Sequence, residues 1–320
     1  MKKYMIDYDE WVDVRGNIQN IRVLANKEDS PVILFLHGGP GVCDRHWIVE
    51  HQHGLAEDYT MVMWDQRGSG KSFNRNIRSE KLDIETYIQD AKALIEFLLE
   101  KFSKKKLIIA GHSWGTVIGA PLAMRYPELI SAFISQGQVV NTEQNELLSY
   151  EFCLNEAKRL GDEKAIDALK DIAPKDGMYA DHAAMMTQRN YLTKYGGESY
   201  KVRTSMTKML LKGVLKSKEY SLFDIPGYAS GALYLSEVLW PQVAKVRYDE
   251  TIKKINVPIL MTTGRHDYNT PFELAKKWFD SLEAPFKKWV WFEDSAHSPI
   301  NEEPQKWQEA VKEFLSEIDC

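Results

Sequence analysis

The sequence predicts an α/β fold: a mostly parallel, doubly wound sheet with a helical cap inserted into it. Short apolar runs of strand length alternate with helical periodicity in the first third of the chain and again after residue 257, which is the rhythm of βαβ units. Between about residues 141 and 250 this rhythm stops, and amphipathic helical patterns dominate. The chain has 320 residues, which is long enough for one core with an insertion.

The first half of the sheet is predicted from apolar runs. Residues 32–36, 59–64 and 107–110 are largely apolar, as expected for strands buried on both faces, and residues 21–24 alternate with the period of a further strand. Residues 84–98 carry apolar side chains at helical spacing, which predicts a helix packed on the sheet.

The second half of the sheet repeats these signals after the helical stretch. Strand runs return near residue 134, at 258–263 and at 289–292, and helical patterns occupy 271–282 and 304–318. We therefore expect a core formed by residues 1–140 and 251–320, and a helical cap, or lid, formed by residues 141–250.

Charge and hydropathy exclude several classes of protein. Lys and Arg number 41 against 46 Asp and Glu, a net charge of −5, so the chain lacks the basic character of proteins that bind nucleic acids or anionic membranes. A hydrophobic fraction of 44% supports a packed interior rather than disorder. A small molecule or a short peptide is the expected partner, and the oligomeric state is left open.

The N-terminus and the cysteines indicate the compartment. The chain turns acidic after Lys2 and Lys3 without an apolar stretch, and no later segment approaches the roughly 18 apolar residues of a membrane span. The three cysteines, Cys43, Cys153 and Cys320, are odd in number and far apart, which favours free thiols in a reducing compartment. We therefore expect a cytoplasmic protein.

The strongest chemical signal is Gly111-His112-Ser113-Trp114-Gly115, which follows a predicted strand and precedes a helical pattern. This is the context that a G-x-S-x-G nucleophile elbow requires. Its glycines allow a sharp turn, so the Ser113 hydroxyl projects from the strand end while the first amides of the helix face a developing oxyanion. Ser113 is the predicted nucleophile.

The predicted base is His297. A serine hydroxyl is a weak nucleophile at neutral pH and needs a histidine base and an orienting carboxylate, which follow the elbow in the order acid, then histidine. Only His182, His266 and His297 follow Ser113. His182 falls in the predicted cap and His266 abuts the best candidate acid, which leaves His297, just after the strand at 289–292.

The predicted acid is Asp267, in the loop that follows the strand at 258–263, where a triad carboxylate belongs. The loop after the preceding strand reads Ser135-Gln136-Gly137-Gln138 and has no carboxylate. Glu273 lies inside the next helical pattern, and Asp294 is too close in sequence to the predicted base to approach its ring well.

The oxyanion hole is predicted from two backbone amides. The loop after the strand at 32–36 reads His37-Gly38-Gly39-Pro40-Gly41, a glycine-rich turn whose amides can approach a carbonyl oxygen closely. We expect the amides of Gly39 and Trp114 to form the hole. A plain tight turn is the alternative for the glycine-rich segment.

Three motifs of the chain occur together: His37-Gly38-Gly39-Pro40-Gly41, Asp65-Gln66-Arg67-Gly68-Ser69-Gly70-Lys71-Ser72, and Gly111-His112-Ser113-Trp114-Gly115. Together they resemble the α/β-hydrolase superfamily, and most nearly its proline iminopeptidase branch. The resemblance covers about residues 31–140 and 257–318, and it does not reach into the predicted cap.

The resemblance implies the fold, the site and the kind of substrate. It implies Ser113, Asp267 and His297 as a catalytic triad, and a helical cap as the element that determines specificity. In that family, acidic groups near the cap bind the free N-terminal amine of the substrate. The chain offers three glutamates for that role, and for each the alternative is an ordinary solvated helix residue: Glu151, Glu156 and Glu237.

Two positions depart from the family pattern. Proline iminopeptidases commonly have glycine where this elbow has His112, and some have glutamate after the triad aspartate, where this chain has Tyr268. The motifs therefore support the assignment to the hydrolases more strongly than the assignment to the aminopeptidases.

Two short patterns suggest a cofactor or a metal site, but neither has the residue spacing that such a site requires. Gly70-Lys71-Ser72 matches the end of a phosphate-binding loop, but that loop needs glycine where this chain has Asp65. His46, His51 and His53 lie close together in sequence, yet no Asp or Cys stands at a convincing ligand spacing from them. We expect neither a cofactor nor a metal.

The expected function is that of a serine hydrolase that forms an acyl-enzyme on Ser113. The favoured substrate is a short peptide from which N-terminal proline or another small residue is released. A carboxylesterase or lactonase acting on small acyl substrates is one alternative, and a non-catalytic homologue that only binds a ligand is the other.

Overall fold

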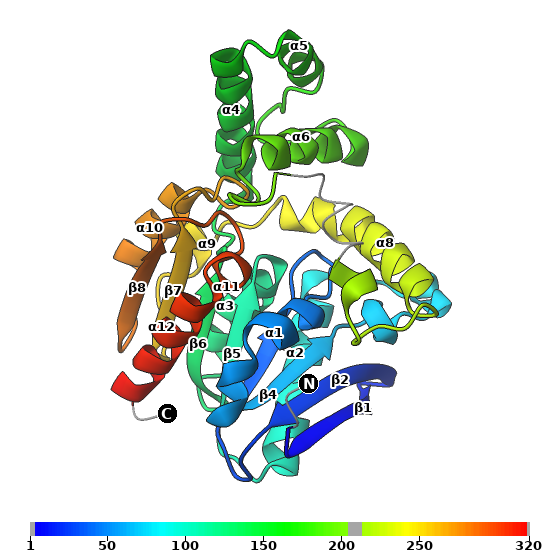
Figure 1. The fold of residues 1–320 in the computed structure, drawn as a ribbon, viewed down its shortest axis with the longest axis vertical. Helices are drawn as coiled ribbons and strands as arrows, with labels where there is room; N and C mark the ends of the chain where they lie inside the picture. The colour runs from blue at the N-terminus through cyan, green and yellow to red at the C-terminus, as the bar shows by residue number, and fades with distance from the viewer. Residues whose placement is uncertain (1–3, 204–212, 319–320) are drawn as a thin grey trace.

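The computed structural model describes residues 4–203 and 213–318. One eight-stranded sheet runs through the core (Figure 1). Its strands, in the order in which they lie side by side, are β1 (Ile6–Val14), β2 (Asn17–Ala25), β4 (Thr60–Asp65), β3 (Val32–Leu36), β5 (Leu107–His112), β6 (Ile130–Gln136), β7 (Ile259–Gly264) and β8 (Lys287–Phe292).

The sheet is mostly parallel, as predicted. The pairings of β3 with β4 and β5, and those from β5 through β8, are parallel, whereas β1 and β2 are antiparallel to their neighbours. In β3, β4 and β7 every residue is buried, because helices cover both faces of the sheet. The carboxyl ends of the parallel strands meet at one edge, where the loops that carry the sequence motifs also meet.

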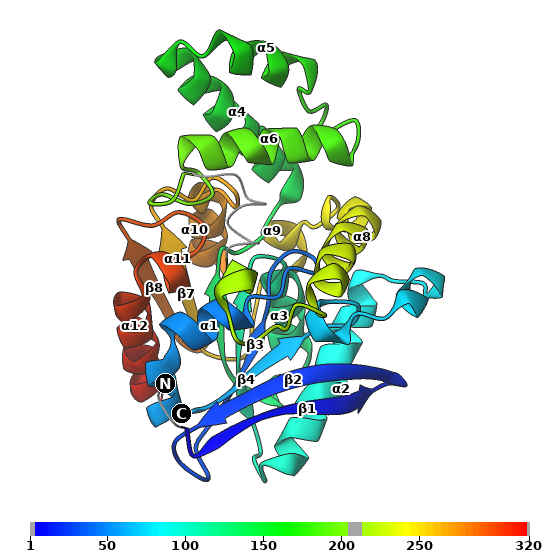
Figure 2. The ribbon, with the colours of Figure 1, turned by 45° about the vertical axis from the view of Figure 1, so that its right-hand side comes forward.

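Helices lie on both faces, which makes the sheet doubly wound (Figures 1 and 2). One hydrophobic cluster joins the sheet to α2 (Ile84–Lys101), α3 (Trp114–Arg125) and α10 (Phe272–Ser281). A second cluster joins the opposite face to α1 (Arg45–His51) and α12 (Pro304–Glu317). The shorter elements are η1 (His53–Glu57), η2 (Gly70–Ser72), η3 (Arg75–Ser79) and α11 (Pro299–Glu302).

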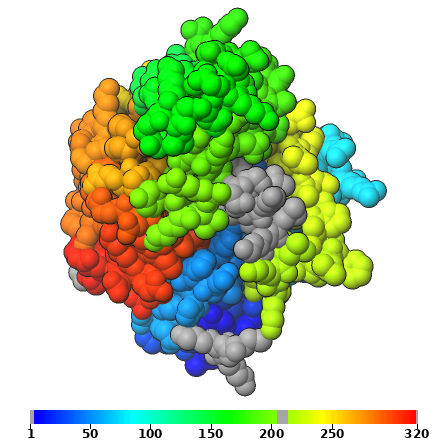
Figure 3. Space-filling view, turned by 45° about the horizontal axis from the view of Figure 1, so that its top comes forward, coloured from blue at the N-terminus to red at the C-terminus, as the bar shows by residue number. Residues whose placement is uncertain are grey.

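Helices fill the described part of the chain between β6 and β7. They are α4 (Thr142–Leu160), α5 (Glu163–Asp171), α6 (His182–Tyr195), α8 (Ile225–Val243) and α9 (Tyr248–Thr251). Side chains of Asn141, Asp162 and Asp181 cap the starts of α4, α5 and α6. In Figure 3 the green residues of α4 to α6 cover the top of the molecule, with the orange and red C-terminal elements on one side and yellow α8 on the other.

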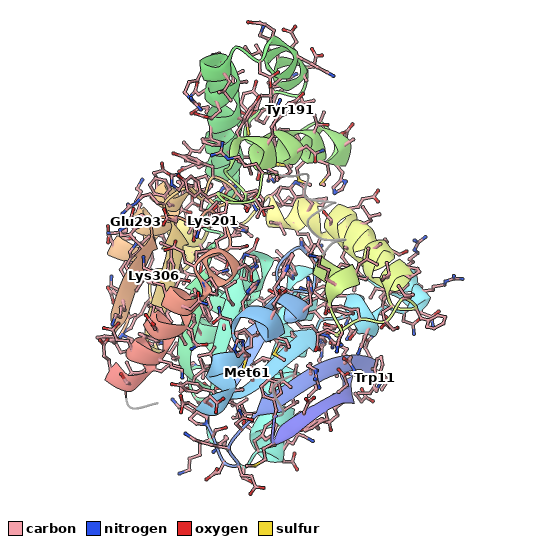
Figure 4. The ribbon with its side chains drawn as sticks, in the orientation of Figure 1. Trp11, Met61, Tyr191, Lys201, Glu293 and Lys306 are labelled. Atoms are coloured by element: carbon pink, nitrogen blue, oxygen red, sulfur yellow. The ribbon has the colours of Figure 1, made fainter. Side chains whose placement is uncertain are left out.

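The helical segment is tied to the core by backbone hydrogen bonds. The amide of Tyr268 donates to the carbonyl of Gly197 at 3.1 Å, and the amide of His297 donates to the carbonyl of Glu198 at 3.2 Å. Close by, the Nζ of Lys201 donates to the carbonyl of Glu302, above α11 (Figure 4). The chain that follows α6 is therefore fixed to the loops after β7 and β8.

Two smaller observations bear on the sequence analysis. Over residues 4–203 and 213–318, no helix combines the length and the apolar character that crossing a bilayer requires. Cys43 and Cys153 are buried free thiols, and Cys320 lies outside the described residues.

Candidate active site

A cavity of about 350 Å³ lies between the carboxyl edge of the sheet and the helices inserted after β6. The sheet side supplies the loops after β3, β5, β6, β7 and β8, and the helical side supplies residues of α4, α6 and α8. Of the residues predicted from the sequence, Ser113, His297, Gly39 and Trp114 line this cavity, and Asp267 lies directly behind His297.

Ser113 occupies the sharp turn between β5 and α3. Its backbone has φ 53° and ψ −116°, a left-handed conformation that is strained for a residue with a side chain. The turn is possible because Gly115 has no side chain: a Cβ there would lie 1.9 Å from the carbonyl oxygen of Leu36. The elbow therefore presses the start of α3 against β3 and leaves Ser113 facing the cavity.

His297 and Asp267 form a buried pair. The Nδ1 of His297 lies 3.1 Å from the Oδ2 of Asp267, and both side chains are almost fully buried. The two alternatives considered for the acid, Glu273 and Asp294, are both exposed. His266 stacks on Tyr200 with the ring centroids 3.8 Å apart.

Thr270 is a further member of this cluster that the sequence analysis did not identify. Its hydroxyl donates to the Oδ2 of Asp267 at 2.8 Å and lies 3.2 Å from the Nδ1 of His297. The amides of Asn269 and Thr270 donate to the Oδ1 of Asp267 at 3.0 and 2.8 Å. The loop after β7 thus fixes the carboxylate in one orientation.

The electrostatic surroundings of His297 favour its charged form. Burial disfavours an imidazolium, but the negative charges of Asp267 and Glu198 outweigh burial and raise the pKa of His297 to about 9. The Nε2 of His297 is buried and has no hydrogen-bond partner among the described residues. The ring nitrogen that would exchange a proton with Ser113 is therefore unoccupied by other protein groups.

The two segments that carry the predicted oxyanion donors are held together by Gln66. Its Oε1 accepts from the indole of Trp114 at 2.9 Å, and its Nε2 donates to the carbonyl of His37 at 3.2 Å. The amide of Gln66 also donates to the Nε2 of His37 at 3.2 Å. One residue of the second motif thereby links the glycine-rich loop to the elbow.

His112, which departs from the family pattern, packs beside His297 with the ring centroids 4.9 Å apart. Its Nε2 lies 3.2 Å from the carbonyl oxygen of His297, and its Nδ1 lies 3.8 Å from the Oδ2 of Asp44. Gly137 makes room on another side of the His297 ring, since a Cβ there would lie 2.6 Å from Cε1. The loop after β6 thus leaves space for the imidazole and supplies no carboxylate.

The glutamates suggested for amine binding do not line the cavity. Glu151 and Glu237 are exposed, and Glu156 pairs with Arg159 at 2.7 Å on the surface of α4. The structure therefore places all three outside the cavity, on the helices α4 and α8.

Two other glutamates line the cavity instead. Glu146 of α4 and Glu198, after α6, are buried, with 1% and 7% of their surface exposed, and each has an Oε2 without a hydrogen-bond partner among the described residues. Burial, with a contribution from Asp267, raises the pKa of Glu198. Buried carboxylate oxygens without donors are costly unless a ligand satisfies them.

Arg189 of α6 forms an ion pair with one of these two carboxylates, that of Glu146. Its Nη2 lies 2.6 Å from the Oε1 of Glu146, its guanidinium carbon lies 5.7 Å from the ring centroid of Trp240, and it lines the cavity. Arg189 thus forms an ion pair with Glu146, whereas Glu198 has no ion pair with another described residue. Within residues 4–203 and 213–318, no three His, Cys, Asp or Glu side chains are grouped closely enough to hold a metal ion.

The comparisons with known proteins agree with the fold and the motifs. Residues 31–171 match the family model of the alpha/beta hydrolase fold. A probable aminopeptidase of Bacillus subtilis (strain 168), YbaC, is 30% identical over 292 residues, covering 90% of this chain and 90% of that protein. A proline iminopeptidase of Lactobacillus helveticus is 23% identical over 312 residues, covering 93% of this chain and 94% of that protein.

Similarity in three dimensions extends over the whole chain. The crystal structure of proline iminopeptidase from Mycobacterium smegmatis superposes with a TM-score of 0.70 at 15% identity, covering 98% of this chain and 99% of that one. The chain belongs to the α/β-hydrolase superfamily and is a hydrolase of that fold. Within the superfamily it is similar to the proline iminopeptidases, as the three motifs predicted.

Proposed function

We propose that the protein is a serine aminopeptidase that releases N-terminal proline, or another small residue, from short peptides. The observation that carries this proposal is the placement of two buried, incompletely bonded carboxylates, Glu146 and Glu198, in the cavity that Ser113 and His297 also line. The names of the similar proteins from Bacillus subtilis and Lactobacillus helveticus support the same activity.

The proposed mechanism is acyl transfer to water in two steps. The Oγ of Ser113 attacks the first carbonyl carbon of the peptide while the Nε2 of His297 takes the hydroxyl proton, and Asp267 stabilises the imidazolium that forms. The amides of Gly39 and Trp114 stabilise the oxyanion. The intermediate expels the remaining peptide, whose amine receives the proton from His297. Water then attacks the acyl-enzyme while His297 takes a proton from the water. This step releases the free amino acid, and Ser113 recovers its proton from His297.

The proposed amine site is the carboxylate pair. A substrate ammonium placed between Glu198 and Glu146 satisfies their unpartnered oxygens and offsets the negative charge that Arg189 leaves uncompensated. Glu198 also adjoins the catalytic base, because its carbonyl accepts from the amide of His297. The ammonium is therefore bound close to the bond that reacts, as an exopeptidase requires.

We propose residues 141–250 as a cap with two roles. Its helices close the cavity on the side opposite the sheet and supply the carboxylates, so the same segment excludes water and selects the substrate. Excluding water strengthens the interactions of the oxyanion with backbone amides.

An esterase or lactonase is the second candidate, because most of the cavity wall is apolar. α8 lines it with Ile225, Ala229, Leu233 and Trp240, which suit a neutral acyl substrate as well as a peptide. The two candidates differ in whether a free amine is required.

Two experiments test the proposal. Ser113→Ala should abolish turnover and labelling by a fluorophosphonate, and hydrolysis that persists in this variant excludes the mechanism. A panel of aminoacyl β-naphthylamides, p-nitrophenyl esters and lactones then separates the candidates. Turnover of Pro- and Ala-β-naphthylamide, lost on N-acetylation, supports the aminopeptidase, whereas ester turnover without any amide turnover refutes it. Failure of the wild-type protein to react with the probe indicates a ligand-binding homologue.

A further inference from the structure

The cavity extends along α8 in both directions from the reacting serine. Side chains of this helix line it from Ile225 to Val243, a stretch of roughly 27 Å at the rise of an α-helix. The middle of the stretch lies over the glycine-rich loop, since a Cβ on Gly41 would be 3.0 Å from the Cα of Ala232. The oxyanion loop therefore sits below the middle of α8, and a substrate carbonyl bound there has cavity on both sides.

The two directions differ in charge. Toward the C-terminal half of α8 lies Trp240, with Arg189 over its ring and Glu146 paired to that arginine. This is the end of the proposed amine site. A peptide whose ammonium is bound there, and whose first carbonyl is at Ser113, must direct its second residue toward the N-terminal half of α8.

The N-terminal half of α8 offers an apolar surface. Ile225 and Ala229 line the cavity here, and Val42 and Trp47 line it from the sheet side. Asp44 also lines the cavity, and its Oδ2 lies 3.8 Å from the Nδ1 of His112. Ala229 is exposed although it borders the cavity, so apolar surface remains in contact with water when no substrate is bound.

We propose that this end of the cavity binds the residue after the scissile bond, and that it selects a bulky apolar side chain at that position. The inference rests on the proposed aminopeptidase function. Contact with Ile225, Ala229 and Trp47 removes apolar surface from water on both partners, which is favourable by about 25 cal/mol per Å². A glycine in the second position has no side chain to bury and gains none of this free energy.

The test uses dipeptide amides with proline first and glycine, alanine, leucine or phenylalanine second, with proline release followed by mass spectrometry. We expect kcat/KM to rise about tenfold or more from Pro-Gly-amide to Pro-Phe-amide. In Ile225→Ser, the ratio of the two kcat/KM values should fall about threefold or more. Both the wild-type series and the variant use the full chain.

The matched control is Leu222→Ser, because Leu222 is 77% exposed and does not line the cavity. Its ratio should equal that of the wild-type protein. Equal cleavage of all four dipeptide amides, or an equal fall of the ratio in both variants, overturns the inference and leaves the aminopeptidase in place. Absence of any amide cleavage alongside ester turnover overturns the proposed function, and the inference with it.

Discussion

The two walls of the cavity are built differently. The sheet wall places Ser113, Asp267 and His297 after β5, β7 and β8, strands whose register is fixed by parallel pairing. The helical wall places Glu146 and Arg189 on α4 and α6, which pack around a smaller hydrophobic cluster of their own. The difference teaches that the proposed reacting groups depend on the sheet, whereas the groups proposed to select the substrate depend on helices that can vary without moving the sheet.

The largest effect is expected on the sheet wall, from Asp267→Asn. An amide at this position holds His297 in the wrong tautomer, and the comparable change in a serine protease lowers kcat about 10⁴-fold. Hydrolysis of both Pro-β-naphthylamide and p-nitrophenyl acetate should fall, because both need the same base. Asp294→Asn is the control, since Asp294 is exposed, and an equal loss there contradicts the assignment of the acid.

On the helical wall, Glu198→Gln should separate the two substrates. Loss of the carboxylate removes a charge-assisted bond to the ammonium, and we expect kcat/KM for Pro-β-naphthylamide to fall about 50-fold more than that for p-nitrophenyl acetate. Glu237→Gln serves as the control on the exposed face of α8. If the activities toward both substrates fall equally in Glu198→Gln, Glu198 does not act in recognition of the amine alone, and the proposed division of roles between the two walls is wrong.

Gln66→Leu tests the link between the two oxyanion segments. The substitution removes the bonds to Trp114 and His37, so the loop and the elbow lose their common support. We expect kcat to fall about tenfold for amide and ester alike, with little change in KM, because the oxyanion forms only in the transition state. A change confined to KM would contradict a role for Gln66 in oxyanion stabilisation. The unfolding temperature, measured in parallel, shows whether the variant is folded.

The smallest effect is a shift of the pH profile. The base acts as neutral imidazole, and the pKa of His297 is raised to about 9, so kcat/KM for p-nitrophenyl acetate should increase as the pH rises toward 9. Glu198→Gln removes one of the negative charges that raise this pKa, and the rising limb should move to lower pH. The ester carries no amine, so the shift reports the enzyme alone. If the pH dependence of kcat/KM is the same in Glu198→Gln and in the wild-type protein, Glu198 does not raise the pKa of His297.

The sheet wall could be predicted from the sequence because its residues follow recognisable strands. Ser113 stands in a local motif, and Asp267 is predicted as the acid because the loop after one strand contains a carboxylate while the loop after its neighbour contains none. β1 was not predicted, since Glu10 stands on its less exposed side and Trp11 on its exposed side, and both interrupt the alternation of apolar and polar residues expected of a strand.

The helical wall could not be predicted in the same way. Glu146 lies seven residues before Cys153 on α4, two helical turns away and on the same buried face, and this spacing was the one signal for it. Glu198 stands in the loop after α6, where no periodicity indicates which way a side chain points. Its position results from backbone contacts with residues about 70 and 99 positions later in the chain, at Tyr268 and His297.

The backbone bonds of Gly197 and Glu198 to the loops after β7 and β8 have a consequence for where a peptide is cut. The Glu198 side of the proposed ammonium site is tied to the loops that carry the proposed acid and base, so its separation from them does not depend on where α4 and Glu146 lie. The distance between the bound ammonium and the cleaved bond is then fixed, and it is counted from the free N-terminus of the peptide. Each turnover removes one residue and leaves a new free end, and an acetylated end offers no starting point.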